Sequence, residues 1–204
     1  DIALALLDKG AKIDCRWMGR TPLIQATRYG YSEVVSRLLC LGADVNAQIY
    51  LDEIEREFLS EAALGYTALH YAALDGKDDL VDILLKHGAK TANTPPAWTP
   101  MNVAAKAGHF GVVTKLLAAG AEADASSLHL AAKYGHASVL RELLAAGASP
   151  DVCGKDLQGE GLYWSPLLSA TAENHALAVR VLLEAGADVN FKWNGKINAL
   201  KMAK

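Results

Sequence analysis

The chain repeats one pattern of helix starts and stops, and this repetition restricts its fold more than any other feature. The pattern is clearest in residues 65–89, GYTALHYAALDGKDDLVDILLKHGA. Thr67 has a hydroxyl that can cap a helix N-terminus, Leu69 begins a helical apolar face, and Gly76 ends that helix. A second apolar stripe follows and ends at Gly88. The segment therefore predicts two short antiparallel helices, which need a neighbouring pair to bury their apolar faces.

The same landmarks return in four further copies. The predicted caps are Thr21, Thr67, Thr99, Ser126 and Ser165, with a further start at Asn198. The first helix of each pair is predicted to stop at Gly30, Gly76, Gly108, Gly135 and Asn174, and the second at Gly42, Gly88, Gly120, Gly147 and Gly186. Glycine and asparagine suit these stops because they tolerate a left-handed backbone. Cap and second stop are 21 residues apart in all five copies, so the helix pair has a fixed length.

The repeated runs identify a family. TPLIQATRYG, TALHYAALDG, SSLHLAAKYGH, LLCLGADVNA and LLEAGADVNF resemble the ankyrin repeat, which has a period of about 33 residues and a T-P-L-H-x-A signature. The resemblance implies an all-α-dominated repeat: an ankyrin-repeat solenoid of helix pairs with short β-hairpin fingers and a concave face. It also implies that His70 and His129, at the signature histidine, are structural residues hydrogen-bonded between repeats. It names no partner.

The pattern predicts a single ankyrin-repeat array over residues 1–204, with variable links between copies. Its predicted parts are a partial repeat at 1–14, repeats at 19–46, 65–91, 97–124, 125–150 and 163–190, an extended acidic finger at 47–64, a long loop at 151–162 and a partial repeat at 196–204. The first part matches only a second helix and the last stops inside a first helix, so we expect an excerpt from a longer protein. Insertions of this kind gather on one side of a repeat stack, where binding is expected.

Composition excludes several functional classes. The formal charge is −3 and no Lys/Arg cluster is present, which gives no electrostatic case for nucleic acid. No apolar run reaches the length of a membrane span, so direct membrane insertion is not expected. Three scattered cysteines do not form a disulfide framework or a metal site. We expect an intracellular location, in the cytoplasm or alternatively the nucleus.

No catalytic, cofactor-binding or metal-binding residues are predicted. The sequence contains no H-E-x-x-H, G-x-S-x-G or C-x-x-C motif. Each histidine lies at a position with a structural explanation, and the glycines of the loop before Tyr163 lack the context of a phosphate loop. We therefore expect a module that is not an enzyme and that binds a protein partner on its concave face, within a scaffold, adaptor, effector or regulatory protein.

Large aromatic and basic residues mark the predicted binding face. These residue types dominate binding hot spots because they bury much area at little cost in rotamer entropy. The predicted partner-binding residues, which precede a cap or a first stop, are Trp17, Arg20, Arg28, Tyr29, Tyr66, Trp98, Lys106, Lys133, Tyr134 and Trp164. The alternative is that the rings only hold neighbouring fingers together, as aromatic cross-strand pairs do.

Three other interpretations stay open. The acidic amphipathic stretch at 49–63 either packs against the adjacent finger or binds a basic partner. Asn46 and Asn190 resemble the asparagines that a hydroxylase modifies in ankyrin repeats, although the same residues form the family's ordinary turn. Finally, the array is a rigid spacer, or it self-associates through its uncapped ends.

Overall fold

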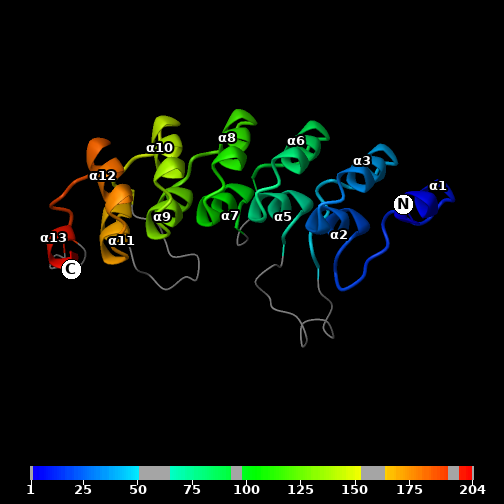
Figure 1. Ribbon diagram of the computed structural model, residues 1–204, viewed down its shortest axis with the longest axis horizontal. Helices are drawn as coiled ribbons and strands as arrows, with labels where there is room; N and C mark the ends of the chain where they lie inside the picture. The colour runs from blue at the N-terminus through cyan, green and yellow to red at the C-terminus, as the bar shows by residue number, and fades with distance from the viewer. Residues whose placement is uncertain (1, 51–64, 93–97, 153–163, 193–197, 204) are drawn as a thin grey trace. The chain divides into compact units, whose positions relative to one another are not determined.

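The computed structural model describes residues 2–50, 65–92, 98–152, 164–192 and 198–203, and these residues form helices joined by turns (Figure 1). The first helices of the pairs are α2 (Pro22–Tyr29), α5 (Ala68–Leu74), α7 (Pro100–Ala107), α9 (Ala125–Lys133) and α11 (Pro166–Ala172). The second helices are α3 (Ser32–Cys40), α6 (Asp78–Lys86), α8 (Phe110–Ala118), α10 (Ala137–Ala145) and α12 (Ala176–Glu184). Single helices lie before and after them, α1 (Ile2–Asp8) and α13 (Ala199–Met202).

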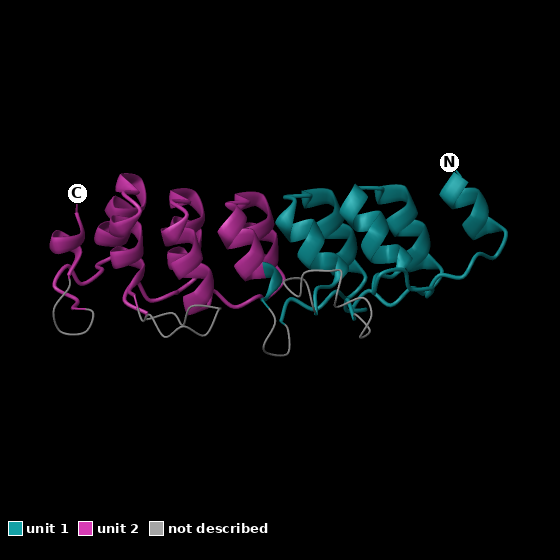
Figure 2. Ribbon diagram, turned by 90° about the horizontal axis from the view of Figure 1, so that it is seen from below, with its two compact units in different colours: residues 1–100 teal, residues 101–204 magenta. Residues whose placement is uncertain are grey.

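The chain divides into two compact units, residues 1–100 and 101–204 (Figure 2). In the first unit α2 packs on α5, α3 packs on α6, and α1 packs on α3. In the second unit α9 packs on α11, while α10 lies between α8 and α12. Within each unit, first helices therefore pack on first helices and second helices on second helices, which is how a repeat buries faces that a single pair leaves open.

Most helix starts agree with the predicted caps. The side-chain oxygens of Thr21, Ser165 and Asn198 each accept a backbone N–H of the helix that follows. The prediction at Ser126 is wrong, because α9 begins at Ala125 and its cap is Asp124. The Asp124 carboxylate accepts the N–H of Ser127 at 2.6 Å. A carboxylate at a helix N-terminus also interacts favourably with the helix dipole, which explains why Asp124 rather than Ser126 is the cap.

The residues predicted to end the helices have a left-handed backbone, as expected from the sequence. The five predicted first stops have φ between 60° at Asn174 and 82° at Gly30, and the second stops have φ between 83° and 98°. Two of the first stops also lie under a histidine ring of the next repeat. A Cβ on Gly108 would come within 2.5 Å of the His136 ring, and a Cβ on Gly135 within 2.6 Å of the His175 ring. Glycine is required at these two positions because a Cβ would clash with the histidine ring and because the backbone is left-handed.

Equivalent leucines of the second helices form the core. Each is at most 1% exposed, and they are Leu38, Leu84, Leu116, Leu143 and Leu182. The predicted register of the second helices is therefore confirmed. Small residues fill the facing positions of the first helices, such as Ala72 and Ala131, which are fully buried.

Pairing between strands is sparse in the fingers. Within the described residues, one isolated antiparallel bridge joins Trp17 and Arg20. Ile49, which begins the acidic stretch, is 4% exposed, and its N–H donates to the Tyr66 carbonyl. The rest of the acidic stretch (51–64), most of the long loop (153–163) and Trp193 lie outside the described residues. In the ranges that the structure describes, no helix is both long and apolar enough to cross a bilayer.

Candidate protein-binding surface

Trp17 lies in a tight turn and is well exposed. Its N–H donates to the Arg20 carbonyl at 3.0 Å, and the Arg20 N–H returns a bond to the Trp17 carbonyl at 3.1 Å. Met18 and Gly19 between them have φ of 50° and 68°, as a type I′ turn requires. The Arg16 guanidinium braces the turn by donating to the carbonyls of Gly19 and Gln48. Trp17 thus presents a side chain that is 64% exposed from a braced backbone.

Arg28 and Tyr29 form a cation–aromatic pair at the end of α2. The Arg28 guanidinium carbon lies 5.7 Å from the centre of the Tyr29 ring, and that ring stacks on Tyr31 at 6.1 Å with 30° between the planes. Both rings are more than half exposed. Lys77 of the next repeat donates to the carbonyl of Arg28 at 2.6 Å, which fixes the end of α2. Tyr31 was not predicted as a site residue, although it stands where three other copies have histidine.

Tyr66 and Trp98, by contrast, are half-buried and belong to the packing around His70. The Tyr66 ring stacks on His70 at 4.7 Å and meets Tyr71 edge-on at 6.0 Å. The His70 Nε2 lies 2.7 Å from the Trp98 carbonyl oxygen. Burial, with a smaller contribution from the Tyr71 hydroxyl, raises the pKa of Tyr66. Trp98 therefore contacts the preceding repeat through its carbonyl, whereas the ring contacts of Tyr66 lie within one repeat.

His70 is a neutral, fully buried histidine whose tautomer follows from its partners. Its Nδ1 accepts the backbone N–H of Thr67 at 3.0 Å, so the proton is on Nε2, which donates to the Trp98 carbonyl. Removal from water lowers the pKa of His70 to about 4, although the bond to Trp98 favours the charged form. The structural role that the resemblance implies for His70 is confirmed. His129 likewise contacts the next repeat, with its Nδ1 3.3 Å from the Ser169 hydroxyl.

Lys106 and Tyr134 come together in the second unit, and Lys133 precedes Tyr134 in the chain. The Lys106 Nζ lies 5.6 Å from the centre of the Tyr134 ring, which stacks on His136 at 6.5 Å with 16° between the planes. Lys106 is exposed, Tyr134 is 42% exposed, and Lys133 is half-buried. The structure thus places a lysine of one repeat over a tyrosine of the next, a contact that the sequence alone does not show.

The other predicted site residues are less accessible. Trp164 precedes the cap of α11 and is half-buried. Arg20 is half-buried too, and its Nε has no hydrogen-bond partner among the described residues. The exposed members of the predicted set are Trp17, Arg28, Tyr29, Lys106 and Tyr134.

Asn46, a candidate for modification, uses both atoms of its amide within the fold. Its Nδ2 donates to the Gly88 carbonyl at 3.2 Å, and its Oδ1 accepts the N–H of Lys90 at 2.8 Å. Its own N–H donates to Asp44. Asn46 therefore has a complete structural explanation as a bridge to the next repeat. Asn190 makes the equivalent backbone bond to Asp188, and it is exposed.

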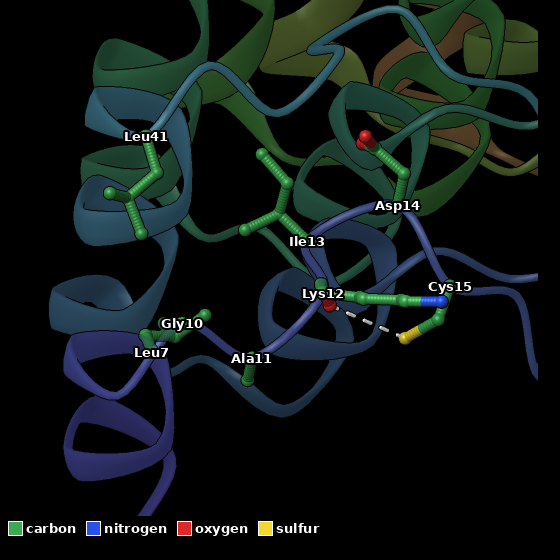
Figure 3. Close-up of a pocket in the computed structure, with 8 residues that line it drawn as sticks. All are labelled: Leu7, Gly10, Ala11, Lys12, Ile13, Asp14, Cys15 and Leu41. Atoms are coloured by element: carbon green, nitrogen blue, oxygen red, sulfur yellow. Dashed lines mark hydrogen bonds between the residues drawn. The ribbon is translucent and has the colours of Figure 1, made fainter.

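An open pocket of about 650 Å³ lies beside the link after α1 (Figure 3). Leu7, Leu41 and Ile13 supply apolar walls, and the exposed thiol of Cys15 donates to the Lys12 carbonyl at 3.5 Å. None of the described residues that line the pocket is a histidine, which is the base that most often activates a catalytic cysteine. Across the described ranges, no group of three or more His, Cys, Asp or Glu side chains is placed to hold a metal ion.

Comparison with known proteins agrees with this architecture. The chain is similar to a probable E3 ubiquitin-protein ligase, XBOS33, of Oryza sativa subsp. japonica, with 40% identity over 42% of this chain and 14% of that protein. It is also similar to the ankyrin repeat protein nuc-2 of Neurospora crassa, with 29% identity over 90% of this chain and 20% of that protein. Human protein phosphatase 1 regulatory subunit 27 is 36% identical over 31% of this chain and 42% of its own length. The chain thus spans less than half of each of these relatives.

The fold has a close match among solved structures. The crystal structure of the human ASB11 ankyrin repeat domain superposes with a TM-score of 0.82 over 98% of this chain and 85% of that chain, at 24% identity. The family model for ankyrin repeats in three copies matches residues 1–49, 51–127 and 128–203. The family model accounts for nearly every residue, and the chain belongs to the ankyrin repeat family.

Proposed function

We propose that the chain is a module that is not an enzyme and that binds a protein partner inside the cell. Its binding surface is formed by the ends of the first helices and the turns that precede them. Ankyrin repeats are in general modules for protein–protein interaction, which supports the class of function. The exposed free thiols of Cys15 and Cys40 agree with a reducing compartment.

One observation carries the choice of surface: exposed aromatic rings stand on backbone that other contacts hold in place. Trp17 projects from a braced turn, Tyr29 from the fixed end of α2, and Tyr134 from the end of α9. A ring on a rigid backbone loses little entropy when a partner covers it, so more of the free energy of its burial appears as affinity. Tyr66, Trp98 and Trp164 are half-buried, so less of their area is available to a partner.

The test compares two triple variants, each of which replaces three large exposed side chains by alanine. The first is Trp17→Ala, Tyr29→Ala and Tyr134→Ala. The control is Leu41→Ala, Leu177→Ala and Leu183→Ala, which removes exposed apolar side chains of α12 and the end of α3. Both variants must first show an unchanged melting temperature. Proteins captured from cell extract by each variant are then quantified by mass spectrometry against the unmodified chain.

We expect a partner that the control variant retains and the aromatic variant loses. Loss of two or three exposed hot-spot rings costs about 1 kcal/mol or more each, so capture falls by about tenfold or more. Equal capture by both variants would contradict the proposed surface. Capture that depends on Leu177 or Leu183 instead would move the binding site to the second helices.

A further inference from the structure

Four residues of the second unit form one contiguous basic and aromatic surface, which we call the lysine–tyrosine patch: Lys106, Lys133, Tyr134 and His136. Lys106 is in the last turn of α7 and Lys133 is the last residue of α9. The Tyr134 ring lies under the Lys106 ammonium, at 5.6 Å, and against the His136 ring, at 6.5 Å. The patch therefore combines positive charge with an exposed aromatic face.

The backbone of the patch is held by two equivalent hydrogen bonds between repeats. The His136 Nε2 donates to the Lys106 carbonyl at 2.9 Å, and the His175 Nε2 donates to the Lys133 carbonyl at 3.0 Å. A carbonyl can only accept, so both histidines carry their proton on Nε2. These bonds fix the ends of α7 and α9 relative to the helices that follow. The lysines thus project from a rigid support, and binding to them orders little backbone.

The helix dipole explains only part of this arrangement. Cations are favourable in the last turn of a helix, which accounts for the positions of Lys106 and Lys133. It does not account for the Tyr134 ring, which lies under the Lys106 ammonium and remains 42% exposed. Lys133 makes no ion pair within the described part of the chain. The whole chain has a formal charge of −3, so the patch is not the consequence of a generally basic composition.

We propose that the lysine–tyrosine patch binds an acidic peptide segment of a protein partner. Asp or Glu side chains of that segment meet the ammonium groups of Lys106 and Lys133, and an apolar or aromatic side chain between them covers the Tyr134 ring. Charge complementarity selects the acidic segment, because basic segments would be repelled and neutral ones would leave the lysines desolvated without compensation. The inference rests on the proposed function, since it specifies the partner of the same surface.

The test begins with a random 12-residue peptide library displayed on phage and selected on the whole chain. Selected peptides are then synthesised with a fluorophore, and their dissociation constants are measured by anisotropy. The variant Lys106→Glu with Lys133→Glu removes the proposed charge. The control Arg141→Glu with Arg180→Glu makes the same change of charge on α10 and α12, in the same unit. A labelled oligothymidine of the same length tests for nucleic acid.

We expect selected peptides to carry at least two acidic residues next to an apolar one. Charge reversal at the patch should weaken their binding by about tenfold or more, while the control variant and Lys106→Arg with Lys133→Arg stay within about threefold. Neutral or basic peptides that bind through Tyr134 would overturn this inference and leave the proposed surface standing. Two outcomes would overturn both this inference and the proposed surface. One is that the selected peptides bind equally well to the variants Tyr134→Ala, Tyr29→Ala and Trp17→Ala, and the other is that no peptide is selected. Binding of the oligothymidine through the two lysines would also overturn the inference.

Discussion

The Nε2 of His70 lies 2.7 Å from the carbonyl oxygen of Trp98, which places a neutral imidazole between α5 and the residues that precede α7. Its Nδ1 accepts the Thr67 N–H, so both ring nitrogens are satisfied in the neutral form with the proton on Nε2. Protonation would leave Nδ1–H facing a backbone donor in a fully buried site. The fold therefore depends on His70 staying uncharged.

This relationship predicts a loss of stability in mild acid. The pKa of His70 is about 4 in the folded chain and 6.5 in its ordinary state, so the unfolded chain binds the proton first as pH falls. Its contribution is fully present above pH 6.5 and is lost progressively down to pH 4. Between pH 7.5 and pH 5, we expect the free energy of unfolding to fall by about 2 kcal/mol on account of His70.

Urea unfolding at both pH values measures this change, with His70→Asn as the comparison. Asparagine does not titrate, so the variant is expected to be less stable at pH 7.5 but to lose about 2 kcal/mol less between the two pH values. An equal decrease in both proteins would assign the acid sensitivity to other groups.

The cap of α9 gives a prediction that separates two neighbouring residues. Asp124 accepts the N–H of Ser127 at 2.6 Å and the side-chain amide of Asn102 at 3.0 Å. Asp124→Ala removes both bonds, and we expect a cost of about 1 to 2 kcal/mol in thermal or urea unfolding. Ser126→Ala, one residue into the helix, should cost less than about 0.5 kcal/mol. A larger effect at Ser126 than at Asp124 would restore the cap predicted from the sequence.

Two glycines with similar backbone angles should respond differently to alanine. Gly135 has φ of 75° and lies under the His175 ring, whereas Gly120 has φ of 84°, and a Cβ added to it would have no atom of the described residues within 4 Å. Gly120→Ala carries only the backbone strain, about 1 to 2 kcal/mol. Gly135→Ala must also displace His175 from the Lys133 carbonyl, so we expect a cost larger by about 1 kcal/mol.

A double variant isolates the displaced ring. In the His175→Ala background, Gly135→Ala should cost no more than Gly120→Ala, because the ring that it would meet is gone. If the extra cost persists in that background, the close approach of His175 is not its cause. Urea unfolding of five proteins gives the comparison: the unmodified chain, the three single variants and the double variant.

The sequence predicted what depends on local chemistry. Helix caps such as Thr21, left-handed stops such as Asn174 and buried leucines such as Leu116 follow from rules that act within one repeat, and the structure confirms them. The cap of α9 differs from the prediction. The prediction assumed the same 21-residue distance from cap to second stop in every copy, and this copy follows a short link. A carboxylate two residues earlier provides the stronger cap there, so Asp124 begins the helix sooner.

The candidate surface depends on geometry between repeats, which spacing does not reveal. Trp98 and Tyr29 occupy comparable predicted binding positions, yet Trp98 is half-buried and Tyr29 is 61% exposed. The contact of Lys106 with Tyr134 likewise requires the relative placement of α7 and α9. Tyr31 carries a sequence signal, because it replaces a histidine found at the aligned position of three other copies. The assignment of all ten residues to a binding face stays a prediction.

Burial of the second-helix leucines gives the last prediction, which checks the register on which the surface depends. Leu116 is fully buried, whereas Leu183 on α12 is 42% exposed. Leu116→Ala removes a side chain from a close-packed interior, and we expect a loss of about 2 to 5 kcal/mol. Leu183→Ala should stay within about 1 kcal/mol. Urea unfolding followed by circular dichroism measures both. If Leu116→Ala proved nearly neutral, α8 would present another face to the core. The position described for the end of α7, which carries Lys106, would then also be wrong.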